Sequence, residues 1–298
     1  MKIIRYHDAR AFYQTVEPLL LEWEAENNLM LGIASRLADG SEKWSDIPPR
    51  FYSVEEEGRV IAAALQTPPH KLILTRTAPM IADLLAGYLQ DEVSSLPGVL
   101  GPAETVDYFV KAWGGRTGRS AERETLRLYR LDQVAALPDI SGRSEVAGEK
   151  DFNLLLRWKS AFLTQVHETS GDLEDALYRQ IARKQIYLWK DPGAVSMASF
   201  SGPTPHGIRI GGVYTPRKHR NHGYATANVA ALSQRLLDSG YQFCYLFTNL
   251  ENPTSNAIYQ QIGYQPICNY LSCRFIYQDP LKQRQWVYGT KRRKRVSE

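Results

Sequence analysis

The chain has few of the features that mark membrane or secreted proteins. It has three cysteines among 298 residues, and no run of about 20 apolar residues of the kind that spans a membrane. Cys244, Cys268 and Cys273 have neither the paired spacing of a disulfide framework nor the spacing of a metal motif. The first residues, MKIIR, lack the apolar run of a secretory signal. We therefore expect a cytoplasmic protein with reduced thiols and no membrane partner.

An excess of charge of one sign is also almost missing. The formal net charge is +4, and residues 291–295, KRRKR, supply five positive charges against one negative charge at Glu298. Residues 1–290 are therefore neutral overall, so we expect no broad basic face and no specific nucleic-acid partner. The basic tail, residues 286–298, leaves one alternative open, which is a weak, salt-sensitive attraction to RNA or anionic surfaces.

The most informative stretch of the chain is a strand, a basic turn and a helix. Residues 208–215 are apolar and β-branched, which predicts a strand, and Pro216 ends it because proline has no N–H for the next ladder bond. The turn carries three basic residues, Arg217, Lys218 and Arg220. Apolar residues then recur at helical spacing from about Gly223 to Gly240, a typical C-terminal glycine.

This turn predicts a site for an anion. The first N–H groups of the helix and the positive end of its dipole face the turn, which favours a phosphate or pyrophosphate. Gly223 removes a side chain where a ligand needs close approach to the backbone. A solvated basic surface is the alternative, but the strand-turn-helix order favours the anion site.

Two motifs of this region resemble those of the GNAT N-acetyltransferases. The acyl-CoA motif of that family is Arg or Gln, two residues, Gly, one residue, and Gly or Ala. Here it consists of Arg220, Asn221, His222, Gly223, Tyr224 and Ala225. The second signature is NPTSNAIY, residues 252–259, followed by IGY at 262–264. Asn221 and His222 stand where the family commonly has glycine or lysine, but asparagine tolerates the backbone angles of a tight turn.

The resemblance implies direct transfer of an acetyl group from acetyl-CoA to a primary amine of a small molecule or a protein, without a metal. The backbone of Val213 and Thr215 would bind the pantetheine arm, and the Val213 amide would polarise the thioester carbonyl. Tyr259 would protonate the departing thiolate as a general acid. The cofactor-binding residues that the resemblance implies are Val213, Tyr214, Thr215, Arg220, Asn221, His222, Gly223, Tyr224, Ala225, Asn252 and Ser255.

Several roles stay open at the level of the sequence. Tyr259 has the alternative role of a core aromatic on a helix. The general base is unassigned, because Glu251 is equally well explained as a solvated turn carboxylate. His219 and His222 have helical spacing but no third ligand for a metal. A non-catalytic acyl-CoA-binding sensor is the alternative function, and a homodimer is left open.

Proline, glycine and serine in residues 137–142 predict a boundary between two modules. We expect a first domain over residues 1–140, an acetyltransferase domain over 141–285 and the basic tail over 286–298. In the second domain, the predicted elements before the anion site are helices over 153–164 and 173–184 and strands over 185–189 and 195–201.

The first module repeats this order in a weaker form. It has an amphipathic pattern over residues 9–37, strand patterns over 50–56, 60–66 and 71–76, and a helical pattern over 78–90. The spacing from Pro102 to Tyr108 equals that from Pro253 to Tyr259, but the basic glycine turn is missing. We expect an α/β protein with mixed sheets, built from two GNAT-like modules in tandem. We expect the N-terminal module to be degenerate, to bind no CoA, and to buttress the active half and help wall the acceptor cleft. A purely structural partner domain is the alternative.

Overall fold

The protein consists of two compact units, which are discontinuous in sequence. The computed structural model describes residues 1–40, 47–93, 95–166 and 172–277, so the predicted basic tail lies outside the described residues. Unit 1 contains Met1–Leu19, Ala34–Glu124 and the chain from Leu271 onward, and unit 2 contains Leu20–Ile33 and Thr125–Tyr270. A single boundary near residue 140 is predicted from the sequence, whereas each of these units contains residues from both sides of that point.

Unit 1 contains a mixed sheet with two pairs of helices. Its elements are β1 (Lys2–Tyr6), α1 (Ala9–Glu22) as far as Leu19, α2 (Asn28–Ala38) from Ala34 onward, β2 (Arg50–Glu56), β3 (Arg59–Gln66), β4 (Leu72–Leu74), α3 (Pro79–Glu92), β5 (Gly98–Pro102), α4 (Ala103–Thr117) and the start of β6 (Ala121–Leu131). The end of α1 and the first part of α2 belong to unit 2. The strand order is β1-β2-β3-β4-β5, with the end of β12 (Gln265–Phe275) beside β5. The β4–β5 pair is parallel, and the pairs from β1 to β4 are antiparallel.

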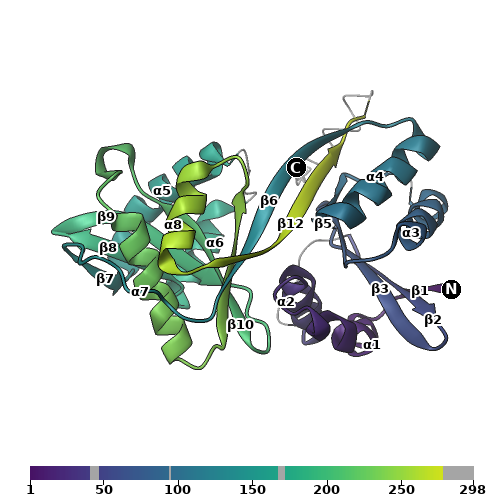
Figure 1. Ribbon diagram of the computed structural model, residues 1–298, viewed down its shortest axis with the longest axis horizontal. Coiled ribbons are helices and arrows are strands. Elements are labelled where there is room, and N and C mark those ends of the chain that lie inside the picture. The colour runs from purple at the N-terminus through teal and green to yellow at the C-terminus, as the bar shows by residue number, and fades with distance from the viewer. Residues whose placement is uncertain (41–46, 94, 167–171, 278–298) are drawn as a thin grey trace, which may run out of the picture. The chain divides into compact units, whose positions relative to one another are not determined.

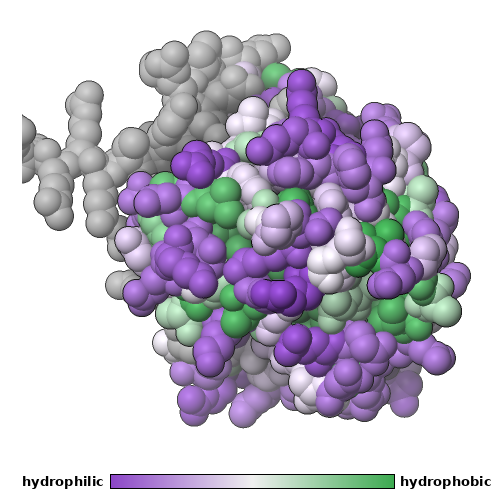
Figure 2. Space-filling model, turned by 90° about the vertical axis from the view of Figure 1, so that its left-hand side faces the viewer, coloured by the Kyte–Doolittle hydropathy of each residue, from purple (hydrophilic) through white to green (hydrophobic). Residues whose placement is uncertain are grey.

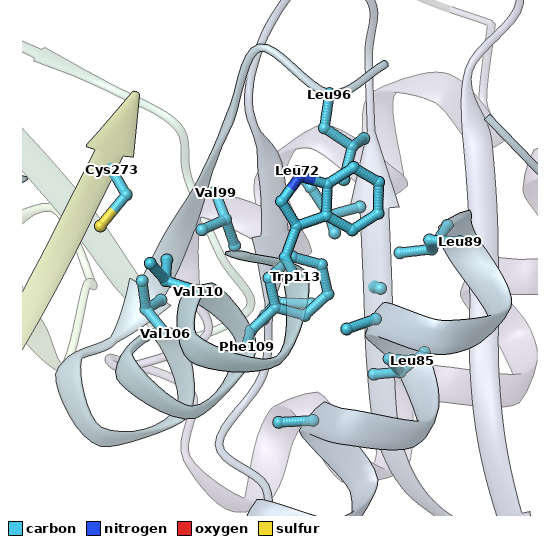
Figure 3. Close-up of a cluster of buried hydrophobic side chains, with 14 of the residues drawn as sticks. Leu72, Leu85, Leu89, Leu96, Val99, Val106, Phe109, Val110, Trp113 and Cys273 are labelled. Atoms are coloured by element: carbon cyan, nitrogen blue, oxygen red, sulfur yellow. The ribbon is translucent and has the colours of Figure 1, made fainter. Parts of the chain in front are cut away.

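The core of unit 1 lies between its sheet and the helices α3 and α4. Trp113 and Phe109 of α4 stack at 6.0 Å between ring centroids, and Leu85 and Leu89 of α3 face them (Figure 3). Each such side chain contributes about 2 kcal/mol by leaving water. The same cluster contains residues from the far end of the chain, namely Leu271, Cys273, Phe275 and Tyr277.

Unit 2 contains a second mixed sheet with the same order of helices and strands. Its elements are β7 (Arg143–Val146), a 3-10 turn (Glu149–Asp151), α5 (Phe152–Gln165), α6 (Leu173–Ala182), β8 (Ile186–Asp191), β9 (Gly193–Ser201), β10 (Gly207–Tyr214), α7 (Tyr224–Asp238), β11 (Phe243–Asn249), α8 (Pro253–Ile262) and β12. The strand order is β12-β6-β11-β10-β9-β8-β7. The pair β10–β11 is parallel, which requires the crossover helix α7 between them.

Helices cover both faces of the unit 2 sheet. In Figure 1, α7 and α8 lie in front of this sheet, and α5 and α6 lie behind it. Neighbouring residues of β9 confirm the two faces, because Met197 belongs to the cluster with Leu155 of α5, and Ala198 belongs to the cluster with Val229 of α7. This alternation follows from the period of two along a strand.

Two strands are shared between the units. Residues 125–131 of β6 belong to unit 2, where Tyr129 and Leu131 are part of the core, although β6 begins in unit 1. The second half of β12 belongs to unit 1, where Gly98 lets the strand approach closely. A Cβ at Gly98 would lie 2.0 Å from the carbonyl oxygen of Cys273. Each sheet is therefore completed by a strand from the other half of the chain.

The predicted elements agree with the structure except in one long helical pattern. The pattern over residues 9–37 is two helices, because Asn27 and Asn28 turn the chain between them. Their side-chain amides donate to the carbonyls of Leu20 and Ala25 at 3.1 and 2.6 Å, respectively. Side chains that compete for backbone hydrogen bonds interrupt a helix in this way.

Hydrophilic side chains dominate the face that carries β7, β8 and β9 at the left of Figure 1, and the apolar side chains there form small, separate groups (Figure 2). Within the described ranges, every helix is too short or too polar to cross a membrane.

Candidate active site

The hydrogen-bonded pairing of strands β10 and β11 ends partway along β10. Their parallel pairing covers Gly207↔Phe243, Ile208↔Cys244 and Arg209↔Tyr245 and then ends, although both strands continue. No described residue of β11 pairs with residues 210–214 of β10. An extended ligand arm can bind to such an unpaired strand edge through backbone hydrogen bonds. The predicted pantetheine-binding residues Val213, Tyr214 and Thr215 lie at this edge or directly after it.

A β-bulge changes the direction of β10 at the same place. The register between β10 and β9 shifts between Gly211 and Tyr214, and Gly212 has a φ of 59°. The Ser199 hydroxyl donates to the Gly211 carbonyl at 2.8 Å, and it would lie 2.8 Å from a Cβ at Gly212. Glycine is therefore required at position 212 for both its backbone angle and its lack of a side chain. Bulges of this kind re-aim the backbone near active sites.

The basic turn after β10 is held by its own side chains. Arg220 Nε donates to the Thr215 carbonyl at 3.0 Å, and His222 Nδ1 donates to the Arg220 carbonyl at 2.7 Å. Asn221 and Gly223 have positive φ values of 64° and 77°. Asparagine and glycine are the residues that adopt this region most readily, so the departure from the family pattern at Asn221 preserves the turn.

The turn leads directly into an uncapped helix. Gly223 is the N-cap of α7 and makes no side-chain cap, and no side chain in the described part of the chain accepts a hydrogen bond from the first N–H groups at Tyr224 and Ala225. Unsatisfied N–H groups and the helix dipole together favour an anion at this position. The predicted residues from Arg220 to Ala225 thus form one continuous turn and helix start.

A carboxylate that the sequence analysis missed lies beside this helix start. Asp191, at the end of β8, accepts hydrogen bonds from the hydroxyls of Tyr224 at 2.7 Å and Ser141 at 2.6 Å. The bonds from Ser141 and Tyr224 lower the pKa of Asp191, so this carboxylate is ionised at neutral pH. It positions Tyr224, whose ring stacks on His222 at 5.5 Å between centroids.

Tyr259 lies inside the unit on α8. Its ring packs against Tyr129 at 6.3 Å and Tyr264 at 6.0 Å between centroids, and its side chain belongs to the cluster against which Val213 packs. Within the described residues, its hydroxyl has no hydrogen-bond partner. Burial raises the pKa of Tyr259 to about 12, so the phenol stays protonated at neutral pH.

Two asparagines organise the start of α8. Asn252 is the N-cap, and its side-chain oxygen accepts from the backbone N–H of Ser255 at 3.0 Å. Asn256 has a larger part in the packing than the sequence indicates, because its amide group accepts from the Tyr129 hydroxyl at 2.9 Å and donates to the Asn249 carbonyl at 3.1 Å. The structure thus assigns Asn252 a capping function, and its contact with a pantetheine arm stays a prediction.

A lysine that the sequence analysis missed lies beside the bulge of β10. Lys159 of α5 donates to Gln180 Oε1 of α6 at 2.6 Å, and its Nζ is 3.8 Å from the place that a Cβ on Gly212 would take. Burial lowers the pKa of Lys159 to about 8. One sequence signal was available, since Lys159 lies four residues after Leu155 and three before Phe162 on the apolar side of the helix.

The other candidates from the sequence have ordinary surroundings. Glu251 is exposed in the turn between β11 and α8, where its N–H donates to Asn249 Oδ1 at 2.8 Å. His222 is occupied by its stacking on Tyr224. Over residues 1–40, 47–93, 95–166 and 172–277, no group of three or more metal-ligating side chains is found.

Comparison with known proteins identifies this arrangement. Residues 203–273 match the model of the FR47-like protein family. A comparison with curated proteins finds no significant match. A GNAT-family acetyltransferase from Colwellia psychrerythraea superposes with a TM-score of 0.56 at 12% identity, covering 93% of this chain and 100% of that chain.

Two further solved structures are similar over most of their length. A Drosophila protein has a TM-score of 0.67 at 12% identity, covering 92% of this chain and 98% of its own. A tandem GNAT protein from the clavulanic acid biosynthesis pathway has a TM-score of 0.50 at 11% identity, covering 93% of this chain and 100% of its own. The chain therefore has the GNAT fold, with two GNAT-like modules in tandem, as its sequence predicts.

Proposed function

We propose that unit 2 is an acetyl-CoA-dependent N-acetyltransferase that transfers the acetyl group directly to a primary amine. The observation that carries this proposal is the unpaired edge of β10, which runs through a bulge into the basic turn and the uncapped start of α7. An extended arm that ends in a pyrophosphate requires this combination of groups. Acetyl-CoA supplies both, together with an activated acetyl thioester.

The residues of unit 2 divide the binding of this co-substrate between them. The N–H groups of Tyr224 and Ala225 and the basic side chains of the turn would hold the pyrophosphate. The backbone of Val213 and Thr215 would hold the pantetheine arm. The Val213 amide would donate to the thioester oxygen and stabilise the negative charge that develops there.

Tyr259 is the group proposed to protonate the departing thiolate. Its pKa of about 12 keeps the proton available, but in the free protein it exceeds that of a thiol near 8.5 by about 3.5 units. Proton transfer therefore requires the positive charge that develops on the attacking amine nitrogen, because a nearby cation lowers the pKa of a phenol. The same buried hydroxyl is thus inert toward solvent and becomes acidic when the acceptor attacks.

The test is release of free thiol from acetyl-CoA in the presence of benzylamine, glycine or spermidine. We expect turnover by the wild type with at least one of these amines, and a loss of about 10²-fold or more in Tyr259→Phe. Acetyl-CoA affinity by calorimetry should be equal in the two proteins, because the variant keeps the ring and loses only the hydroxyl. Equal turnover would remove Tyr259 from this role, and binding without turnover would favour the acyl-CoA sensor.

A further inference from the structure

Lys159 carries its amine into the protein, beside the bulge of β10. Trp158, its neighbour on α5, packs against Tyr214 at 6.1 Å between ring centroids, which fixes α5 over the end of β10. The Gln180 amide oxygen orients the Lys159 amine from α6 at 2.6 Å. Gly212 leaves the space between this amine and the strand backbone open, because its missing Cβ would lie 3.8 Å from Nζ.

No described carboxylate neutralises this lysine. The titratable or charged residues on α5 and on the elements packed against it are Glu149, Lys150, Asp151, Arg157, Glu174, Asp175, Tyr178, Arg179, Arg209 and Tyr214. Burial is the only cause resolved for the lowered pKa of Lys159, so none of these groups shifts it. With a pKa of about 8, about one fifth of Lys159 is a neutral amine near pH 7.4.

We propose that Lys159 is the general base of the acetyl transfer, which takes the proton from the acceptor amine at the bulge of β10. This inference rests on the proposed function of unit 2. Lys159 adjoins Gly212, and the next residue, Val213, carries the amide assigned to the thioester oxygen. The amine that attacks this thioester must approach the same short stretch of backbone. A lysine is suited to this task when burial brings its pKa close to the operating pH.

The proposed step balances within the groups already named. The lone pair of the acceptor nitrogen forms the new N–C bond, and the neutral Lys159 amine takes the proton that this nitrogen loses. The C–S bond breaks, its electron pair stays on sulfur, and the sulfur takes the proton of the Tyr259 hydroxyl. Lys159 then releases its proton to water, and Tyr259 regains one, so the products are the amide and free CoA thiol.

Two measurements test this inference. The first is competitive labelling of the lysines in the free protein with trace acetic anhydride between about pH 6 and pH 11, followed by mass spectrometry. Lys159 should titrate with a midpoint near pH 8. The second is the pH dependence of kcat with the amine that the wild type acetylates, at saturating acetyl-CoA. The wild type should have an acidic limb with the same midpoint, near pH 8.

The variants separate a base from a structural lysine. Lys159→Arg keeps the charge but cannot act as a base near neutral pH, and Lys159→Met removes the charge at similar length. Both should lose kcat by about 10²-fold or more and lose the limb near pH 8. If the acidic limb of the kcat profile arises from ionisation of the acceptor amine itself, it remains in the wild type and in all variants. Lys150→Arg, an exposed lysine just before α5, is the matched control and should behave as the wild type.

The outcomes distinguish the two proposals. Wild-type kcat and an unchanged pH profile in both Lys159 variants, or a labelling midpoint near the ordinary lysine pKa, would overturn the role of Lys159 and leave the transferase intact. Absence of wild-type turnover with every amine would overturn both proposals. Equal acetyl-CoA affinity in all variants shows that their unit 2 is folded.

Discussion

The two units have the same order of strands and helices but differ at the junction where a ligand would bind. In unit 2, the pairing of β10 and β11 ends at Arg209↔Tyr245 while β10 continues. In unit 1, β4 and β5 pair at Ile73↔Leu100, and a Cβ at Gly101 would lie 2.7 Å from the Leu74 carbonyl oxygen. The two strands of unit 1 therefore stay in contact to the end of β4, and among the described residues β4 has no unpaired stretch like that of β10.

The N-termini of the corresponding helices, α7 in unit 2 and α3 in unit 1, also differ in their ability to bind an anion. Helix α7 begins after Gly223, and its first N–H groups are not capped by a described side chain, whereas α3 begins with Pro79, which has no N–H. The N–H of Thr77, just before α3, is occupied by the Thr105 hydroxyl at 3.0 Å. The comparison teaches that the fold alone does not make the site. The site also requires a glycine-containing turn and a strand edge left unpaired where two parallel strands separate. We therefore expect only unit 2 to bind acetyl-CoA.

Unit 1 contains a strand segment from the far end of the sequence, and the largest expected effect follows from this. A chain that ends at Tyr270 lacks Leu271, Cys273, Phe275 and Tyr277, which are buried in the core of unit 1. Loss of four buried side chains costs about 10 kcal/mol, as much as the whole stability of a typical domain. Hydrogen exchange with mass spectrometry should show loss of protection in α3 and α4 and retained protection in α7.

A chain that ends at Tyr277 is the matched control for this truncation. It keeps all four core residues and should protect α3 and α4 as the full chain does. Full protection of α3 and α4 in the shorter chain would show that unit 1 does not need the strand from the far end of the sequence.

A smaller effect is expected when the partly buried charge of Lys159 in unit 2 is removed. The pKa of Lys159 is about 8 in the folded protein, against 10.5 for a fully solvated lysine, so the unfolded chain binds this proton more tightly. The resulting penalty is fully present below about pH 8 and disappears as the pH rises through 10.5. Lys159→Met should therefore stabilise unit 2 near pH 7 by at most about 3 kcal/mol, and the gain should vanish at high pH.

Buried thiols measure this change for each unit separately. Cys244 lies in the core of unit 2 and Cys273 in the core of unit 1, and both are fully buried. The rate of Cys244 labelling in urea should fall in Lys159→Met near pH 7, whereas Cys273 labelling should not change. Lys150→Met removes an exposed charge and should change neither rate. Slower Cys244 labelling at every pH would contradict the assigned cause.

The smallest effect is expected at the unit 1 counterpart of Tyr259. Tyr108 has the same spacing from a proline, but the residue is 41% exposed, against 8% for Tyr259. Tyr108→Phe should leave thiol release from acetyl-CoA within about twofold of the wild type, since surface changes away from special features have little effect. A drop as large as that of Tyr259→Phe would mean that the two tyrosines are not functionally different.

Local signals explain why much of the unit 2 site could be predicted from the sequence. Pro216 ends β10, Gly223 begins α7, and Gly240, with a φ of 109°, follows its end. Proline and glycine end or begin an element through the local backbone, so these boundaries can be recognised from the sequence alone. The Tyr259 prediction needed the family resemblance as well, because the sequence pattern alone is equally typical of a core aromatic.

The rest depends on contacts between distant residues. No local pattern of residues 265–275 indicates that Cys273 packs beside Gly98 in unit 1. The bulge at Gly212 and the burial of Lys159 arise only when α5 packs on β10. The position of a charged residue in the sequence also does not identify the general base. Glu251 is close to the motif in sequence but exposed, whereas Lys159 is distant in sequence and lies at the bulge.

Calorimetric titration of acetyl-CoA into the wild type, Gly223→Asn and Gly223→Asp tests the central claim most directly. Both side chains tolerate the φ of 77° and meet the same neighbour, the flexible end of Ile140 at 2.9 Å, so the variants differ only in charge. We predict binding to the wild type and Gly223→Asn with affinities within about threefold, and at least tenfold weaker binding to Gly223→Asp. Equal affinities of the two variants, or no binding to the wild type, would contradict an acetyl-CoA site at the start of α7.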